Sequence, residues 1–218
     1  MAEQSPAAIA EALLGALEQY GQGDYIGESI NQLEHSLQAA HQARTAGMCP
    51  LLPGRSASLM AVVGARDELV IAALLHDIGQ IIPLEASKEV RMSLRNSAEN
   101  VGRVGHEAIG AEYLHSVGFS ETVCRLVNSH VAAKRYLTAV DRAYYDSLST
   151  ASQKSLAFQG GPFQGDELCA FDRDPLRDEM VALRRWDDAA KLVGIEATTP
   201  RARSYHDTIV THLSQGRA

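Results

Sequence analysis

The chain has 218 residues, of which 45% are hydrophobic and 22% charged, and this length supports one substantial hydrophobic core. It carries 27 acidic against 20 basic residues, a net charge of −7, without any block rich in lysine or arginine. These values argue against extended binding to nucleic acid or to an anionic membrane, so an anionic ligand must be held locally. Neither a membrane span nor a signal-peptide pattern is found, and we therefore expect a cytoplasmic protein.

Apolar residues recur at helical spacing along most of the chain, and no comparable stretch alternates with period two. The pattern therefore predicts an all-α fold. Ser5-Pro6 has the composition of a helix start, and four glycines are placed to end helices: Gly21, Gly47, Gly79 and Gly118. The expected helices cover residues 9–20, 30–40, 69–79, 109–117, 123–137 and 178–193.

No linker rich in Pro, Gly or Ser divides the chain, which predicts a single domain over residues 1–218. Within it we expect an N-terminal helix over 1–20, a core over 24–191 and a C-terminal extension over 192–218. Segments 48–64 and 159–175 contain several Gly and Pro residues and are predicted as long loops. The three cysteines lack metal-type spacing, which predicts reduced thiols at Cys49, Cys124 and Cys169.

His76 and Asp77 form the most informative feature of the chain, because they end an apolar run that begins at Leu69. A core helix does not normally carry a histidine and an aspartate unless something compensates their desolvation. A metal ion would do so, and a buried ion pair between the two side chains is the alternative. The dipeptide alone leaves both interpretations open.

Further metal-capable side chains lie on the apolar faces of other expected helices. A single histidine in such a position is more often a hydrogen-bonded core residue than a ligand. Because several separate helices carry these groups, the sequence favours a shared metal site. The residues are His35, His106, His130 and Asp187.

This order of residues resembles the HD-domain metalloproteins, specifically the members with six ligands instead of the minimal four. Short motifs narrow the resemblance to the mixed-valent diiron phosphonate oxygenases. These enzymes cleave the carbon–phosphorus bond of 1-hydroxy-2-aminoethylphosphonate or of its trimethylammonio analogue. The motifs are Tyr25-Ile-Gly-Glu28, Gln32-Leu-Glu-His35, His130-Val-Ala-Ala-Lys134, Ser149-Thr-Ala-Ser152 and Leu183-Arg-Arg-Trp-Asp187, and the match runs from about Asp24 to Lys191.

The resemblance implies an HD-domain helical bundle that holds two iron ions in the Fe(II)/Fe(III) state, with O2 as co-substrate. It implies that Asp77 bridges the ions, and we assign catalysis to Asp77, His106 and His130. A set of imidazole and carboxylate ligands without thiolate suits iron or manganese. Two metals ~3.5–4 Å apart could hold substrate on one ion and a second reactant on the other. The implied ligands are His35, His76 and Asp187 for one ion, and His106 and His130 for the other.

A phosphonate dianion is costly to bury unless cations meet it. The resemblance assigns its oxygens to Lys134, Arg184, Ser152 and Ser155. Lys134 follows His130 by one helical turn and therefore shares its face. The alternative for Lys134 and Arg184 is that they lie on solvated helix faces. For Ser152 and Ser155, spacing alone would favour a role as helix caps.

The resemblance implies that Tyr25 and Glu28 cover the open iron site and contact the nitrogen end of the substrate. Amine-specific relatives commonly carry a histidine where this chain has Gln80. We therefore expect the substrate 1-hydroxy-2-(trimethylammonio)ethylphosphonate, which Glu28 and Tyr25 could attract by charge and cation–π contact, giving glycine betaine and phosphate. The same chemistry on 1-hydroxy-2-aminoethylphosphonate, giving glycine and phosphate, is the alternative.

Two other functions stay open from the sequence. A metal-dependent phosphohydrolase, in which metal-bound water attacks phosphorus, is the common activity of HD proteins. A ligand-binding regulator with a degenerate HD fold would not need six intact ligands. The sequence leaves the oligomeric state open.

Overall fold

The computed structural model describes residues 4–25, 27–46, 62–84, 91–93 and 100–216. Two short strands, β1 (Arg91–Ser93) and β2 (Asn100–Arg103), pair antiparallel, and the rest of the regular structure described is helical, so the all-α prediction is confirmed apart from this pair. The helices are α1 (Pro6–Tyr20), α2 (Gln32–Ala46), α3 (Val62–Leu75), α4 (Ile78–Ile81), α5 (His106–Ser116), α6 (Glu121–Val140), α7 (Arg142–Ser147), α8 (Thr150–Phe158), α9 (Gly165–Asp172), α10 (Arg177–Ala189), η2 (Ala202–Tyr205, a 3-10 turn) and α11 (His206–Gln215).

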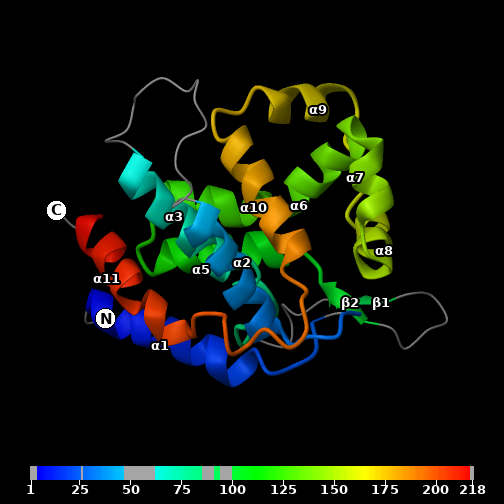
Figure 1. Cartoon of the computed structure of the whole chain (residues 1–218). Helices are drawn as coiled ribbons and strands as arrows, with labels where there is room; N and C mark the ends of the chain where they lie inside the picture. Colours follow the sequence, from blue (N-terminus) through cyan, green and yellow to red (C-terminus); the bar gives the residue numbers. More distant parts are fainter. Residues whose placement is uncertain (1–3, 26, 47–61, 85–90, 94–99, 217–218) are drawn as a thin grey trace.

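Helices α2, α3, α6 and α10 pack against one another and form the centre of the fold, with α5 lying along α6 (Figure 1). The apolar run of α3 is buried from Val70 to Leu75, as expected for a helix that is hydrophobic all round. Helices α1 and α11, from the two ends of the chain, lie side by side, and α11 also contacts α3. This packing supports the proposed single domain. Among the described helices, none combines the length and hydropathy needed to cross a bilayer.

Side-chain caps explain where several helices begin. Pro6 is the first residue of α1, and the Ser5 hydroxyl accepts a hydrogen bond from the amide of Ala8 at 3.2 Å, so the predicted start is confirmed. Ser120 caps α6 in the same way. At the other ends, Gly21 follows α1 and Gly118, with φ +97°, follows α5.

The predicted loop over residues 159–175 is wrong in its central part, which forms α9. Asp166 and Glu167 lie in the first turn of this helix, where carboxylates interact favourably with the helix dipole. Phe171 packs against Tyr136 of α6, with ring centroids 4.7 Å apart. Tertiary packing therefore outweighs the local Gly and Pro content. Of the other predicted loop, residues 48–61 lie outside the described part of the chain and 62–64 belong to α3.

The last long helix ends earlier than predicted. Helix α10 stops at Ala189, whereas the sequence predicted helix to residue 193. The reason is that Gln38 of α2 binds the backbone beyond the helix, accepting from the Leu192 amide at 3.0 Å and donating to the Leu192 carbonyl at 2.7 Å.

Cys124 and Cys169 are free thiols, as predicted, and Cys49 lies outside the described residues.

His76 and Asp77 form the turn between α3 and α4, so the predicted end of the apolar helix is confirmed at the doublet. Gly79 does not end a helix, contrary to the prediction, because it lies inside α4. There, a Cβ atom would lie 2.0 Å from the carbonyl oxygen of His106 and 2.7 Å from the amide nitrogen of Gly110. Glycine is thus required by the close approach of α4 to α5.

We expect Gly79→Ala to destabilise the protein by ~2 kcal/mol or more, since overpacking of a closely packed contact commonly costs 1–3 kcal/mol. Gly15, an exposed residue within α1, has nothing within 4 Å of the position of a Cβ, and Gly15→Ala is the matched control. The control should stabilise the chain by ~0.5–1 kcal/mol through helix propensity. Urea unfolding of both variants measures the difference, and equal stability would contradict the packing argument.

Candidate metal centre

Four buried histidine rings from four segments meet in the core, and each is anchored through Nδ1. The Nδ1 atoms of His35, His76, His106 and His130 lie 2.8, 2.8, 3.1 and 2.7 Å from backbone carbonyl oxygens. A carbonyl oxygen only accepts, so each Nδ1 carries a hydrogen, and Nε2 of the neutral ring presents a lone pair to the site.

The Nε2 atoms form two close pairs. They lie 3.0 Å apart in His35 and His76, and 2.9 Å apart in His106 and His130. Two lone pairs facing each other at this separation need positive charge beside them. Two nitrogens bound at right angles to one ion at ~2.1 Å would lie about 3.0 Å apart, so each pair has the spacing of neighbouring ligands on one metal ion.

One carboxylate spans both histidine pairs. Oδ1 of Asp77 lies 3.2 and 3.5 Å from Nε2 of His106 and His130. Oδ2 lies 3.5 and 3.7 Å from Nε2 of His76 and His35.

Asp187 joins one pair alone. Its Oδ1 atom lies 3.4 and 3.9 Å from Nε2 of His35 and His76. The structure thus brings the six expected ligand residues together in the grouping that the resemblance implies, while their role as iron ligands stays a prediction.

The electrostatics of this cluster suit a cation. Burial lowers the pKa of His76 to about 4, so its ring stays neutral. Burial opposes ionisation of Asp77, but His76 and the contacts with His106 and His130 outweigh it and hold the pKa of Asp77 well below its usual range. Burial also acts against a charge on His106, yet Asp77 raises the pKa of that ring. The ionised Asp77 carboxylate therefore draws positive charge into the core, and a metal ion fits the donor set.

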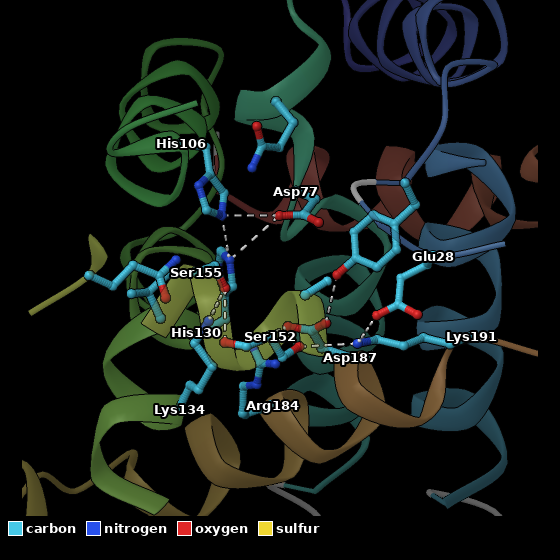
Figure 2. A pocket seen from close by; sticks show the side chains of 15 residues that line it. Glu28, Asp77, His106, His130, Lys134, Ser152, Ser155, Arg184, Asp187 and Lys191 are labelled. Atoms are coloured by element: carbon cyan, nitrogen blue, oxygen red, sulfur yellow. Dashed lines mark hydrogen bonds and ion pairs between the residues drawn. The ribbon is translucent and has the colours of Figure 1, made fainter. Parts of the chain in front are cut away.

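A small pocket opens beside the histidine pairs (Figure 2). Asp77, His106, His130 and Asp187 form part of its wall. The pocket brings together all the residues predicted to contact the substrate: Tyr25, Glu28, Gln80, Lys134, Ser152, Ser155 and Arg184.

Lys134 and Arg184 are buried cations on this wall, at 3% and 4% exposure. Lys134 Nζ donates to the Ser155 hydroxyl at 2.9 Å. Burial, together with the charge of Arg184, lowers the pKa of Lys134 to about 7. An anion bound nearby would restore the charged form of Lys134, so this group suits an anionic ligand.

Arg184 is held by three neighbours. It donates to Oδ2 of Asp187 at 2.8 Å, to the Tyr144 hydroxyl at 3.2 Å, and to both carboxylate oxygens of Asp188. Burial disfavours its charge, but Asp187 and Asp188 outweigh this and raise the pKa of Arg184 well above its ordinary value. The guanidinium is therefore fixed and permanently charged at the pocket wall.

Ser152 and Ser155 do not cap α8, although their spacing in the sequence allowed a capping role instead of a substrate contact. Ser149 is the cap, and its hydroxyl accepts from the amide of Ser152 at 3.2 Å. Ser152 and Ser155 lie within the helix and line the pocket.

Tyr25 lies over one histidine pair. Its ring stacks on His35 with centroids 3.7 Å apart, and its hydroxyl donates to Oδ1 of Asp187 at 3.3 Å. Burial and the charge of Asp187 raise the pKa of Tyr25 well above its usual value, so it stays a neutral phenol. Gln80 also lines the pocket, and its side-chain oxygen accepts from the amide of Arg103 at 2.9 Å.

Two residues at the site were not predicted. Gln32 donates to Oδ2 of Asp77 at 3.0 Å, and it precedes His35 by one helical turn, a spacing that could have identified it. Lys191 lines the pocket and pairs with Glu28 at 2.8 Å. Lys191 follows Asp187 by four residues, but α10 ends before it, so helical spacing alone does not place its side chain.

Comparisons with known proteins agree with this architecture. Residues 33–155 match the model of the HD domain family. A hydroxymethylphosphonate dioxygenase of Gimesia maris is 34% identical over 210 residues, which cover 96% of this chain and 90% of that protein. A [1-hydroxy-2-(trimethylamino)ethyl]phosphonate dioxygenase (glycine-betaine-forming) of Leisingera caerulea is 33% identical over 188 residues, covering 86% and 83%. The chain therefore belongs to the HD-domain family and, over most of its length, is a relative of phosphonate dioxygenases.

Proposed function

We propose that this chain catalyses the O2-dependent cleavage of the carbon–phosphorus bond of a 1-hydroxyphosphonate. The observation that carries the proposal is a cluster with two histidine pairs and one shared carboxylate, directly beside a pocket with two buried cations. A dinuclear site suits reactions with O2, and buried cations suit a phosphonate dianion. The phosphonate dioxygenases among its relatives support the same reaction class.

The reaction balances without any external reductant. One O2 takes up four electrons from the substrate, the C1–H and C–P bonds break, and new C–O and P–O bonds form. The products are a carboxylate, phosphate and one proton. The chain therefore has to bind the phosphonate, hold C1 at the reactive centre and keep bulk water away.

Lys134 and Arg184 would hold the phosphonate oxygens, with the hydroxyls of Ser152 and Ser155 beside them. Arg184 has five N–H donors, more than its carboxylate and phenol partners require. Because both side chains are buried at the pocket wall, the phosphonate would be oriented as well as neutralised.

Two iron ions bound by the six ligand residues would supply the redox chemistry and the open positions for O2 and for substrate oxygens. The chain fixes the ligand geometry through the Nδ1 contacts of its histidines. Tyr25 remains a neutral donor to Asp187 above one pair, where it would cover the site until substrate arrives.

The substituent on C1 is the finer part of the proposal. The sequence-based hypothesis of a trimethylammonio substrate, with glycine betaine as product, requires Glu28 and Tyr25 in the pocket, and both residues line it. The primary amine, giving glycine, would use the same contacts. For either cationic substrate the ion pair of Glu28 with Lys191 has to open.

The direct test is phosphate release from 1-hydroxyphosphonates by iron-loaded protein, with and without O2. We expect phosphate only with O2, together with stoichiometric O2 uptake and a carboxylate product. Release of phosphate from a phosphomonoester without O2 would instead identify a metal-dependent phosphohydrolase. Full activity of zinc-loaded protein would also overturn the oxygenase proposal, because zinc has no redox chemistry.

We expect two iron ions per chain, and Asp77→Ala should lose both because its carboxylate is shared. Asp187→Ala should mainly weaken the ion of the His35 and His76 pair. His115, an exposed histidine on α5, provides the control, and His115→Ala should retain two ions. Metal analysis per folded chain measures these values, and one ion left in Asp77→Ala would contradict the shared role.

Lys134→Ala should retain iron but raise KM for the phosphonate roughly tenfold to a hundredfold, since losing a hydrogen bond to a charged group costs ~1.5–3 kcal/mol. Lys154→Ala is the matched control, because Lys154 lies on α8 outside the pocket lining. Steady-state kinetics on iron-replete protein separates the two. An unchanged KM in Lys134→Ala would remove this residue from substrate recognition.

A further inference from the structure

Lys191 enters the pocket from a backbone segment that is fixed on both sides. The carbonyl of the preceding Ala190 lies 2.8 Å from Nδ1 of His35, and Gln38 binds both backbone groups of Leu192. The side chain of Lys191 is only 13% exposed. Lys191 is therefore a largely buried residue of the pocket wall, carried by an anchored backbone segment.

The ammonium group of Lys191 has an oxygen partner for each of its three N–H donors. Nζ lies 2.8 Å from Oε1 of Glu28, 3.3 Å from the Ser149 hydroxyl and 3.2 Å from the Ser152 hydroxyl. The face of the Tyr25 ring lies beside it, with Nζ 5.8 Å from the centroid. Figure 2 shows Lys191 reaching across to Glu28 and Ser152. These groups form a complete ammonium site, and a side chain of the protein fills it.

One carboxylate oxygen of Glu28 binds two of the same groups. Its Oε1 atom accepts from Lys191 and from the Ser149 hydroxyl, the latter at 2.7 Å. A cationic substituent on the substrate could reach Glu28 only by displacing Lys191 or by lying next to a like charge. Burial lowers the pKa of Lys134, and the charges of Arg184 and Lys191 add to this effect, so three basic side chains share this small pocket.

We infer that Lys191 is a specificity-determining residue, which occupies the end of the pocket where a substrate ammonium would lie and selects 1-hydroxyphosphonates with an uncharged substituent on C1. This inference rests on the proposed function and narrows its substrate class. The smallest such substrate is hydroxymethylphosphonate, whose cleavage with O2 balances to formate, phosphate and a proton. It contradicts the preference for a trimethylammonio substrate that the sequence suggested, because that hypothesis did not include Lys191.

A pair of compounds that differ in charge but not in shape separates charge from size. These are 1-hydroxy-2-(trimethylammonio)ethylphosphonate and 1-hydroxy-3,3-dimethylbutylphosphonate, in which carbon replaces the cationic nitrogen. Hydroxymethylphosphonate serves as the reference substrate. For each compound kcat/KM is measured with the iron-loaded enzyme at equal O2, and a compound with slow turnover is ranked by its inhibition constant against hydroxymethylphosphonate.

The wild-type enzyme should favour the uncharged member of the pair at least tenfold. Lys191→Met should reduce this ratio at least tenfold, whereas Lys191→Arg, which keeps the charge, should keep the wild-type ranking. Lys154→Met controls for loss of a positive charge on the chain and should leave the ratio unchanged. Iron content and thermal midpoint are measured for every variant, and the wild-type ranking decides the question even where a variant does not fold.

Three results would overturn the inference. The first is a wild-type preference for the trimethylammonio compound, and the second is an unchanged ratio of kcat/KM values in folded Lys191→Met. The third is an equal loss of kcat/KM for all compounds in that variant, which would make Lys191 a phosphonate ligand. Failure of the proposed function looks different, because none of the three compounds would then release phosphate with O2.

Discussion

The Asp77 carboxylate, shared between two histidine pairs, is the contact on which the rest of the site depends. Its two oxygens each face one pair, and the rings come from α2, from the turn after α3, and from α5 and α6. Without a cation, four ring nitrogens with lone pairs and two carboxylates would converge in an apolar core, which is costly. Binding of metal at this cluster would therefore be coupled to the packing of these helices.

Backbone carbonyls connect this metal cluster to the specificity of the pocket. The carbonyl of Ala190 orients His35, and the side chain of the next residue, Lys191, enters the pocket and pairs with Glu28. At the pair of His106 and His130, the carbonyl of Arg103 orients His106. The guanidinium of Arg103 donates to the carbonyl of Gly79 at 2.7 Å. A shift in either segment would thus move a proposed metal ligand and the pocket wall together.

The sequence predicted which histidines and aspartates meet in the core, because helical periodicity shows which face of a helix turns inward. It also predicted the helix start at Ser5 and the position of Lys134 at the pocket, because both depend on residues nearby in the chain. It failed where distant segments meet. Gly79 is required by a contact with α5, and Lys191 meets Glu28 across 163 positions, which no local pattern encodes.

The charges around the pocket explain why substrate binding should depend on metal. Four carboxylates, those of Glu28, Asp77, Asp187 and Asp188, face three cations, Lys134, Arg184 and Lys191. The chain alone therefore leaves a small negative excess, to which a phosphonate dianion would add in a poorly solvated space. Two iron ions would reverse the sign of this excess. The phosphonate would then be attracted jointly by the metals and by the buried cations, while Lys191, paired with Glu28, would contribute little attraction and mainly exclude a second positive charge.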